Sequence, residues 1–543
     1  MIKKLLNGQS KTITSAAILL GVASLASKAL GFVKLRLLST VFTAPVTDTF
    51  FVAVKAPDFV FNLLVLGAIS SSFIPIFVSY LDKQDIQDGW DFVNGVLNFL
   101  LISTAIISVV FIIFAPLVVK TLAPGIVSDS ERFNLTVSLT RVLFLSPIIF
   151  AASSVMGGVL RSFKRFLLYA IAPIFYNVGI IIGILFFSKQ WGMFGVAIGA
   201  IIGASMHFLI QFVGALALGF KFKFVLPLKH RGVRKLAKLM VPHIMGIATN
   251  QVNILVFTFL SSQLLKGDIT IFNYANIIQN LPIGLFSISL ALAAFPTMAS
   301  FAAKKQKEEF VKTFSDTARQ ILFWIIPTSA IMFALRAQLV RTIVGSKNFP
   351  WESTVATYQT LGYFAIGMFA VGLLPLVSRA FYALNDTLTP FLAGLVSVAV
   401  SIIGGFYISN KMGVAGLGVA FVIAAIVNIV ILIAILKARL KDIKLSGIFK
   451  MLAKILPATV IMLIVIQSVK YWVAPQIDMQ TFTGIFYQSS LAGIAGIVVY
   501  CSVCLALKCE EMITFLQALG RRIHLKKPLQ VTEIIEDIDE QNY

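Results

Sequence analysis

Long apolar runs dominate this sequence and restrict its fold more than any other feature. They recur from residue 13 to residue 506, and only 13% of the 543 residues are charged, whereas soluble globular proteins carry about 25%. A chain that crosses a bilayer must satisfy its own backbone hydrogen bonds, so it crosses as helices or as barrel strands. The apolar residues here are continuous rather than alternating, which favours helices. The sequence therefore predicts an all-α polytopic membrane protein.

The run boundaries predict fourteen transmembrane helices in two parallel six-helix lobes, followed by a C-terminal helix pair. The predicted spans are 13–41, 49–81, 92–122, 133–160, 167–187, 194–220, 236–265, 269–302, 310–344, 354–383, 390–408, 415–435, 448–473 and 486–506. The predicted domains are an N-terminal lobe at 1–220, a basic cytoplasmic linker at 221–238, a C-terminal lobe at 239–440, transmembrane helices 13 and 14 at 441–507, and a cytoplasmic tail at 508–543. We expect the linker to include an interfacial amphipathic stretch, "GVRKLAKLM", and the tail to be mobile.

Basic residues mark alternate loops, as the positive-inside rule requires. The predicted outer loops hold only isolated cations, such as Lys189, Lys266 and Lys411. The predicted cytoplasmic set is Lys3, Lys4, Lys11, Arg161, Lys164, Arg165, Lys221, Lys223, Lys229, Arg231, Arg234, Lys235, Lys238, Lys304, Lys305, Lys307, Lys437, Arg439, Lys441 and Lys444. Both termini are therefore predicted to be cytoplasmic. The net charge of +22 follows this loop pattern and forms no basic groove with interleaved aromatic residues, so we expect no nucleic-acid partner.

A shift of 221 residues superimposes the prolines and glycines of the two halves. Pro75 falls on Pro296, so "PIFVSYL" lies over "PTMASFA", and Gly192 falls on Gly413, so "GMFGVAIGA" lies over "GVAGLGVAF". A single offset for such distant regions indicates two homologous halves. Six spans separate equivalent positions, and an even number preserves orientation, so the repeat is predicted to be parallel.

Ionisable residues inside the predicted spans are the candidate functional residues, because charge in a bilayer is costly and usually faces a bundle interior or a hydrated cavity. In the second span, Asp48, Lys55, Asp58 and Asn62 follow spacings of 7, 3 and 4, which places them on one helix face. The other candidate cavity residues are Lys28, Lys34, Arg36, Arg141, Asn253 and Asn276. Cations outnumber acids in this set, which predicts a cavity for an anionic group such as a phosphate or diphosphate. The alternative is that these residues form internal salt bridges between helices.

Enzyme signatures are missing from the sequence. It contains no Walker loop, HExxH or GxSxG motif, and its four histidines are scattered. Cys501 and Cys504 lie in an apolar run and are interpreted as buried, inert cysteines. We therefore expect a monomeric transporter with no metal or cofactor and no enzyme activity. Its energy source would be a coupling monovalent ion, the membrane potential or the substrate's own gradient.

Several motifs together resemble one protein family. These are "SKALGFVKLRLLS", "TDTFFVAVKAPDF", "GAISSSFIPIFVSYL", "LAPG", "LTRVLF", "GGVLRSFKRFLLYAIAPIFYNVGII", "LPIGLFSISLALAAFPTMAS" and "AFYALNDTLTP". In collinear order they resemble the MurJ (MviN) lipid II flippases of the multidrug/oligosaccharidyl-lipid/polysaccharide (MOP) exporter superfamily. The resemblance implies a fourteen-helix protein of the bacterial inner membrane. Such a protein carries undecaprenyl-diphosphate-linked peptidoglycan precursor to the outer leaflet by alternating access of two lobes around a cationic cavity.

The family's functional residues match this sequence only in part. Its two basic residues of the first span correspond to Lys28 and Lys34, and its acidic and basic residues of the second span correspond to Asp48 and Lys55. The sequence departs from the family pattern at Leu35, Phe61, Asn62, Leu66, Asn276 and Ile277. Two alternatives stay open at this point. One is a related exporter of another lipid-linked oligosaccharide or of a small molecule, and the other is a scaffold or polytopic enzyme of envelope assembly.

Overall fold

The computed structural model describes residues 13–66, 73–83, 85–225, 229–440 and 446–524, and within these ranges the chain forms helices and no β-strand. The first half contains α2 (Ile13–Val41), α3 (Ala44–Val60), η1 (Phe61–Leu66), α4 (Ile74–Asp82), α5 (Ile86–Ile113), α6 (Ala115–Leu122), η3 (Pro124–Ile126), α7 (Ser130–Leu143), α8 (Leu145–Ser162), α9 (Phe166–Ile182), η4 (Gly183–Phe187), α10 (Ser188–Trp191) and α11 (Met193–Leu216). The second half contains α12 (Arg231–Ser262), α13 (Asp268–Pro282), η6 (Ile283–Ile288), α14 (Ser289–Ala303), α15 (Lys307–Ala334), α16 (Arg336–Val344), α17 (Trp351–Ala383) and α18 (Leu388–Leu440). The C-terminal part contains α19 (Ser446–Val473), η7 (Ala474–Gln476), α20 (Phe482–Ala506) and α21 (Glu510–His524).

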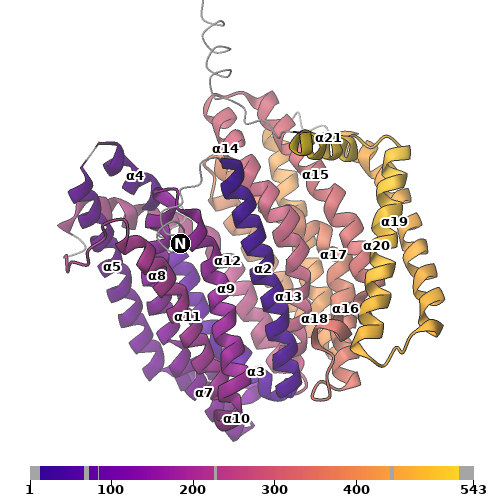
Figure 1. The fold of residues 1–543 in the computed structure, drawn as a ribbon, viewed down its shortest axis with the longest axis horizontal. Coiled ribbons are helices and arrows are strands. Elements are labelled where there is room, and N and C mark those ends of the chain that lie inside the picture. Colours follow the sequence, from indigo (N-terminus) through magenta and orange to yellow (C-terminus); the bar gives the residue numbers. More distant parts are fainter. Residues whose placement is uncertain (1–12, 67–72, 84, 226–228, 441–445, 525–543) are drawn as a thin grey trace, which may run out of the picture.

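These helices form two lobes and a peripheral pair (Figure 1). In the first lobe, α9 packs against α2 and α11, and α3 packs against α7. In the second lobe, α17 packs against α13, α15 and α18. The pair α19 and α20 lies at the edge of the molecule, where α19 packs against α15. The predicted all-α architecture of two lobes and a C-terminal pair is confirmed.

Ten of the described helical segments are long and apolar enough to cross a membrane. The longest, α18, has 53 residues and would extend about 80 Å if straight, far beyond the roughly 30 Å of a bilayer core. It turns at Gly413, whose φ is 57°, and Ser397 in its first half donates a hydrogen bond of 3.0 Å to the carbonyl of Ala424 in its second half. The ten segments include neither α2 nor α12 nor the interrupted α3–α4 segment. The count of fourteen spans therefore stays a prediction.

The internal repeat is visible in the helix boundaries. A shift of 221 residues places α5 on α15 and α6 on α16 with the same starting residues, and it places the start of α7 on that of α17. Gly192 and Gly413 superimpose, and both have positive φ, at 51° and 57°. Glycine suits this position because a side chain is strained at positive φ. The two halves therefore share one fold.

The segment predicted to be a mobile cytoplasmic tail, residues 508–543, is helical in its first part. This part forms α21, which packs against α15 instead of being mobile. Arg319 on α15 donates hydrogen bonds of 2.7 Å to Glu511 and 2.6 Å to Glu510. These charge-assisted hydrogen bonds attach α21 to α15, and they could not be predicted from the composition of the tail. Residues 525–543 lie outside the described residues, as do Lys3, Lys4, Lys11, Lys441 and Lys444.

Small residues allow α9, η4 and α11 to approach closely. A Cβ atom on Gly183 would lie 2.5 Å from the carbonyl oxygen of Gly195 and 2.7 Å from the Cα of Gly199. Backbone atoms of a packed helix cannot retreat as a flexible side chain can, so even a methyl group does not fit there. The equivalent Gly404 has more room, because its Cβ would lie 3.5 Å from the Cβ of Ala420.

We predict that Gly183→Ala destabilises the first lobe by about 1–3 kcal/mol, the usual cost of overpacking. Gly404→Ala, its repeat partner, is the matched control and should be close to neutral. Thermal unfolding of the two purified variants, followed by intrinsic fluorescence in one detergent, compares them. Equal melting temperatures would show that the close approach of η4 and α11 is not a stability determinant.

Candidate functional site

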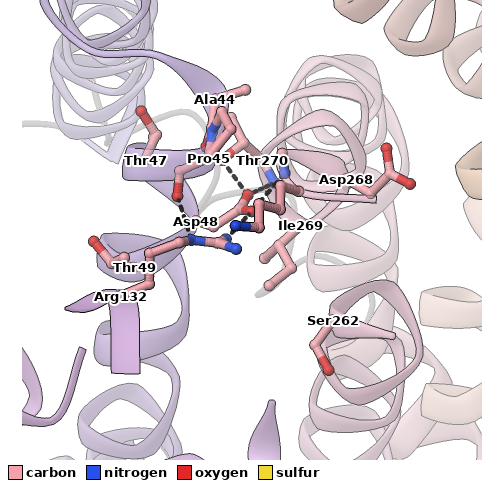
Figure 2. Close-up of polar contacts among 12 residues, drawn as sticks. Ala44, Pro45, Thr47, Asp48, Thr49, Arg132, Ser262, Asp268, Ile269 and Thr270 are labelled. Atoms are coloured by element: carbon pink, nitrogen blue, oxygen red, sulfur yellow. Dashed lines mark hydrogen bonds and ion pairs between the residues drawn. The ribbon is translucent and has the colours of Figure 1, made fainter. Parts of the chain in front are cut away.

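The carboxylate of Asp48 joins the start of α3 to the start of α13, at the end of the molecule predicted to face outward (Figure 2). One carboxylate oxygen, Oδ2, accepts hydrogen bonds of 2.7 Å from Arg132 and 2.7 Å from the backbone N–H of Gly267. The other, Oδ1, accepts hydrogen bonds of 2.8 Å from both the backbone N–H and the hydroxyl of Thr270. Asp48 is 1% exposed, so these donors replace the water that the charge would otherwise bind.

The position of the donors explains why a carboxylate is stable there. The N–H groups of Gly267 and Thr270 lie at the N-terminus of α13, where backbone donors have no partner within the helix and the helix dipole favours an anion. Arg132 is held in place by a second hydrogen bond of 3.2 Å to the carbonyl of Pro45. Asp48 and Arg132 belong to the first lobe and the other two residues to the second. We call these four residues the Asp48 network, and they close one lobe onto the other.

Further contacts close the same end on both sides of the Asp48 network. The end of α2 meets the loop after α16, where Arg36 donates to the carbonyl of Gly345 and Asn348 donates a hydrogen bond of 2.7 Å to the carbonyl of Thr40. On the other side, Lys266 forms an ion pair of 2.8 Å with Asp129. The hydrogen bond from Lys266 holds the pKa of the Asp129 carboxyl below its usual value, so this ion pair persists at neutral pH and weakens only as the pH falls through that lowered pKa.

Gly125 shows how tight this closure is. Its N–H donates a hydrogen bond of 3.4 Å to the hydroxyl of Ser262 at the end of α12. A Cβ atom at this position would lie 1.7 Å from the carbonyl oxygen of Ser262, so the contact excludes any side chain. The outer ends of the two lobes therefore touch through backbone as well as through charge.

A second group of charges lies deeper, where α2, α3, α9 and α13 face one another. Lys34 donates a hydrogen bond of 3.2 Å to Asn177, and Lys55 donates one of 2.7 Å across the lobes to Asn273. Asp58 is solvent-exposed although it lies within a helix that crosses the bundle. Its carboxylate lies near enough to interact electrostatically with both ammonium groups. We call Lys34, Lys55 and Asp58 the inner charge cluster.

A pocket of about 320 Å³ opens beside this cluster, between α2, α9 and α13. Lys28 and Lys34 both line it, together with Asn177 and Asn280. The Lys28 ammonium is 3.5 Å from the carbonyl oxygen of Leu281, which is a long contact. Within the described residues, neither Lys28 nor the two lysines of the inner charge cluster lies within 4.0 Å of a carboxylate oxygen. Three ammonium groups and one carboxylate leave a net charge of about +2 here.

The remaining predicted cavity residues lie elsewhere. Arg36 and Asp48 take part in the contacts that close the outer end. Asn62 donates a hydrogen bond of 3.2 Å from η1 to Gln251 of the second lobe. Arg141 is exposed and donates a hydrogen bond of 3.3 Å to the carbonyl of Ile112. Asn276 accepts a hydrogen bond from Asn280 on its own helix. Asn253 lines a different cavity of about 360 Å³ inside the second lobe.

Sequence reasoning did not identify four residues as members of the site. Arg132 precedes the predicted span 133–160 and is therefore expected to be an isolated loop cation, although its charge binds Asp48. Asn273 was one of several amides in its span, and only its contact with Lys55 distinguishes it. Asn177 lies inside the motif "FYNVGII", which offered a weak signal. Thr270 carried no signal at all, because its role depends on the position of a helix start.

Known proteins share both this sequence pattern and this fold. The sequence model of the family described as "Lipid II flippase MurJ" matches residues 38–489. The chain is 25% identical to the lipid II flippase MurJ of Burkholderia cenocepacia, over 77% of this chain and 82% of that protein. It is also 25% identical to the "Probable lipid II flippase MurJ" of Bdellovibrio bacteriovorus, over 92% of this chain and 96% of that protein.

Solved structures agree with this assignment at the level of the fold. A lipid II flippase MurJ in an inward closed conformation superimposes with a TM-score of 0.73 at 23% identity, covering 90% of this chain and 98% of that one. An inward-facing multidrug resistance MATE family transporter of the MOP superfamily superimposes with a TM-score of 0.63 at 15% identity, covering 77% of this chain and 95% of that one. Because the family model spans most of the sequence, the chain belongs to the lipid II flippase MurJ family.

Proposed function

We propose that this chain carries lipid II, the undecaprenyl-diphosphate-linked peptidoglycan precursor, from the inner to the outer leaflet of the bacterial cytoplasmic membrane. One observation carries the proposal most directly: uncompensated ammonium groups line a pocket that lies behind a closed outer end. The MurJ family membership supplies the substrate, and the cation excess supplies a physical reason for it. The protein would act as a transporter and not as an enzyme.

The charges suit a diphosphate better than a neutral cargo. A site with a net charge of about +2 in a medium of low dielectric attracts phosphate oxygens strongly. Lys28, Lys34 and Lys55 each offer a point charge rather than the flat fork of an arginine. Lysine side chains are long and flexible, so the three ammonium groups, two from α2 and one from α3, can converge on one diphosphate. Asp58 would hold Lys34 and Lys55 in place while the pocket is empty.

Alternating access would follow if the outer end opened while the opposite end of the molecule closed. In the structure, the outer end is closed by the Asp48 network, by the contacts of Arg36 and by the ion pair of Lys266. Apart from the ion pair between Asp48 and Arg132, which lies within the first lobe, these contacts join one lobe to the other. If the lobes tilt as rigid bodies, the outer contacts break together and the inner charge cluster becomes accessible from outside.

The membrane potential would favour both halves of such a cycle. An inside-negative potential drives the anionic diphosphate outward and draws the uncompensated lysines of the empty protein inward, each by about 2.3 kcal/mol per charge per 100 mV across the full field. A coupling monovalent ion is the other source of energy that we consider.

We further propose a monomer with both termini cytoplasmic and with lobes at 1–220 and 239–440, joined by the basic linker at 221–238 and followed by transmembrane helices at 441–507 and the tail.

We predict that Lys34→Gln and Lys55→Gln each abolish function without preventing membrane insertion. Each change removes a charge-assisted contact with the diphosphate, worth about 1.5–3 kcal/mol, or roughly ten- to hundredfold in affinity. The measurement is growth of a bacterial strain depleted of its own lipid II flippase and supplied with each variant.

Lys189→Gln is the matched control, because Lys189 is an exposed outer-end lysine that should tolerate the change. Lys55→Arg keeps the positive charge but replaces the ammonium with a larger, planar guanidinium, so we expect this variant to restore growth in part. Immunoblots of membranes establish equal expression. Full rescue by both Lys34→Gln and Lys55→Gln would refute the proposed substrate site, and failure of the parent chain to rescue would refute the proposed cargo.

We predict that Asp48→Asn opens the outer end. The change removes the charge that Arg132 and the start of α13 bind. It also leaves Arg132, whose side chain is only 13% exposed, without a counterion in the closed state, and breaking a fully buried pair in this way costs about 3–5 kcal/mol. Spin labels on cysteines at positions 189 and 410, which are exposed outer-end positions related by the repeat, report the distance between the lobes. Double electron–electron resonance should show a longer distance population in Asp48→Asn than in the parent.

Glu131→Gln is the control for this measurement, because Glu131 is an exposed acid on the same helix as Arg132. It should leave the distance distribution unchanged. The same short distance in Asp48→Asn as in the parent would show that the Asp48 network is not needed for closure.

A further inference from the structure

A second basic pocket, separate from the inner charge cluster, lies at the outer end of the molecule. It has a volume of about 450 Å³, and we call it the outer basic pocket. Its walls come from three parts of the fold. The first part contributes Arg36 of α2. The second contributes Arg341 of α16, Lys347 of the loop after α16 and Trp351 at the start of α17, and the third contributes Gln480 and Phe482 at the start of α20.

The three cations of this pocket have no acidic partner in the described part of the chain. The lining contains no carboxylate, and no ion pair within 4.0 Å involves Arg36, Arg341 or Lys347. Arg36 donates to the carbonyls of Gly345 and Arg341 at the end of α16, which offsets only about half a charge.

Among the described residues, the side chains of Arg341 and Lys347 have no hydrogen-bond partner. The Arg341 guanidinium lies 5.6 Å from the centre of the Trp351 ring, and that of Arg36 lies 5.5 Å from the centre of the Phe482 ring. Aromatic rings fix the direction of a guanidinium while leaving its N–H donors available. The pocket is therefore built around positive charge that the described protein atoms compensate only in part.

The surroundings indicate an anion delivered at the outer membrane boundary. Trp351 and Phe482 are 56% and 48% exposed, and exposed aromatic side chains at the ends of transmembrane helices are typical of the headgroup level. Lys347 and Gln480 lie in exposed connecting segments, so the pocket is also reachable from water. Planar guanidinium groups and a nearby ammonium match phosphate oxygens better than they match a single carboxylate.

We propose that the outer basic pocket binds a phosphate or diphosphate group at the outer face, either as a free anion or as the headgroup of an outer-leaflet lipid, and that its occupation holds the outer end closed. The pocket takes Arg36 from the first lobe and Arg341 and Lys347 from the second. Opening of the outer end separates these walls. A ligand that needs all of them binds the closed state better and so shifts the population toward it. The proposal does not depend on the identity of the transported cargo.

The test uses the full chain in nanodiscs, with Cys501, Cys504 and Cys509 replaced by alanine and spin labels at positions 189 and 410. One arm adds inorganic pyrophosphate to nanodiscs of phosphatidylcholine. The other arm adds no free anion and includes a polyprenyl diphosphate in the lipid. The variant is the double substitution Arg341→Gln and Lys347→Gln. The control is Lys120→Gln, an exposed outer-end cation that does not line the pocket.

We expect a ligand-dependent gain of the short distance in the parent and in Lys120→Gln. In the double variant the apparent affinity should fall about tenfold or more, because two charge-assisted contacts are lost. A response in the pyrophosphate arm identifies a free-anion site, and a response in the polyprenyl arm alone identifies a lipid headgroup site. No response in either arm, or equal responses in the parent and the double variant, would overturn the proposal. Melting temperatures without ligand establish that the double variant is folded.

Discussion

The burial of one carboxylate between two lobes is the interaction on which the observed conformation depends. Asp48 is nearly inaccessible to water, and its hydrogen bonds come from Arg132 in its own lobe and from the start of α13 in the other. Such a charge is stable only while its donors surround it. Separation of the lobes would expose Asp48 to water and release the N-terminus of α13 at the same time. The outer end is therefore suited to two discrete states, one sealed and one hydrated, rather than to a gradual range of openings.

The two lobes share a fold but not a charge pattern, and this difference gives the interior its chemistry. The repeat superimposes Lys55 on Asn276, and the lysines of the inner charge cluster come from α2 and α3 of the first lobe. In the second lobe their partners are amides and carbonyls: Lys55 donates to the side chain of Asn273, and Lys28 contacts the carbonyl of Leu281. An amide compensates an ammonium only weakly, so the interface keeps an excess of positive charge that an anionic cargo can neutralise. Internal salt bridges, the alternative interpretation of these residues, account for Asp48 and Arg132 but not for the lysines.

Prediction from sequence succeeded where the signal was local or periodic. Helices, lobes and the repeat follow from apolar runs and recurring glycines, and helix starts such as those of α5 and α15 agree with the predicted offset of 221 residues. It failed where a contact joins distant segments. Asp48 was assigned to the cavity from its helix face, yet it bonds Arg132, 84 residues away, and Thr270, 222 residues away. Helical periodicity gives the direction of a side chain but not the element that it meets. The docking of α21 by Arg319 was missed for the same reason.

The sequence by itself determined that this chain is a helical membrane protein with two related halves and an excess of cations in its first lobe. These properties depend on composition, on period and on the cost of charge in lipid, which are all readable along the chain. Only the tertiary structure decided which charged residues form the contacts that close the outer end and which stay available to bind an anion. Asp48, Arg132 and Arg36 hold the outer end, whereas Lys28 and Lys34 line a pocket and Lys55 contacts the amide of Asn273 across the lobes. The physical reason is that the charge of a residue is set by its type, but its compensation is set by the partners that packing brings within hydrogen-bonding distance.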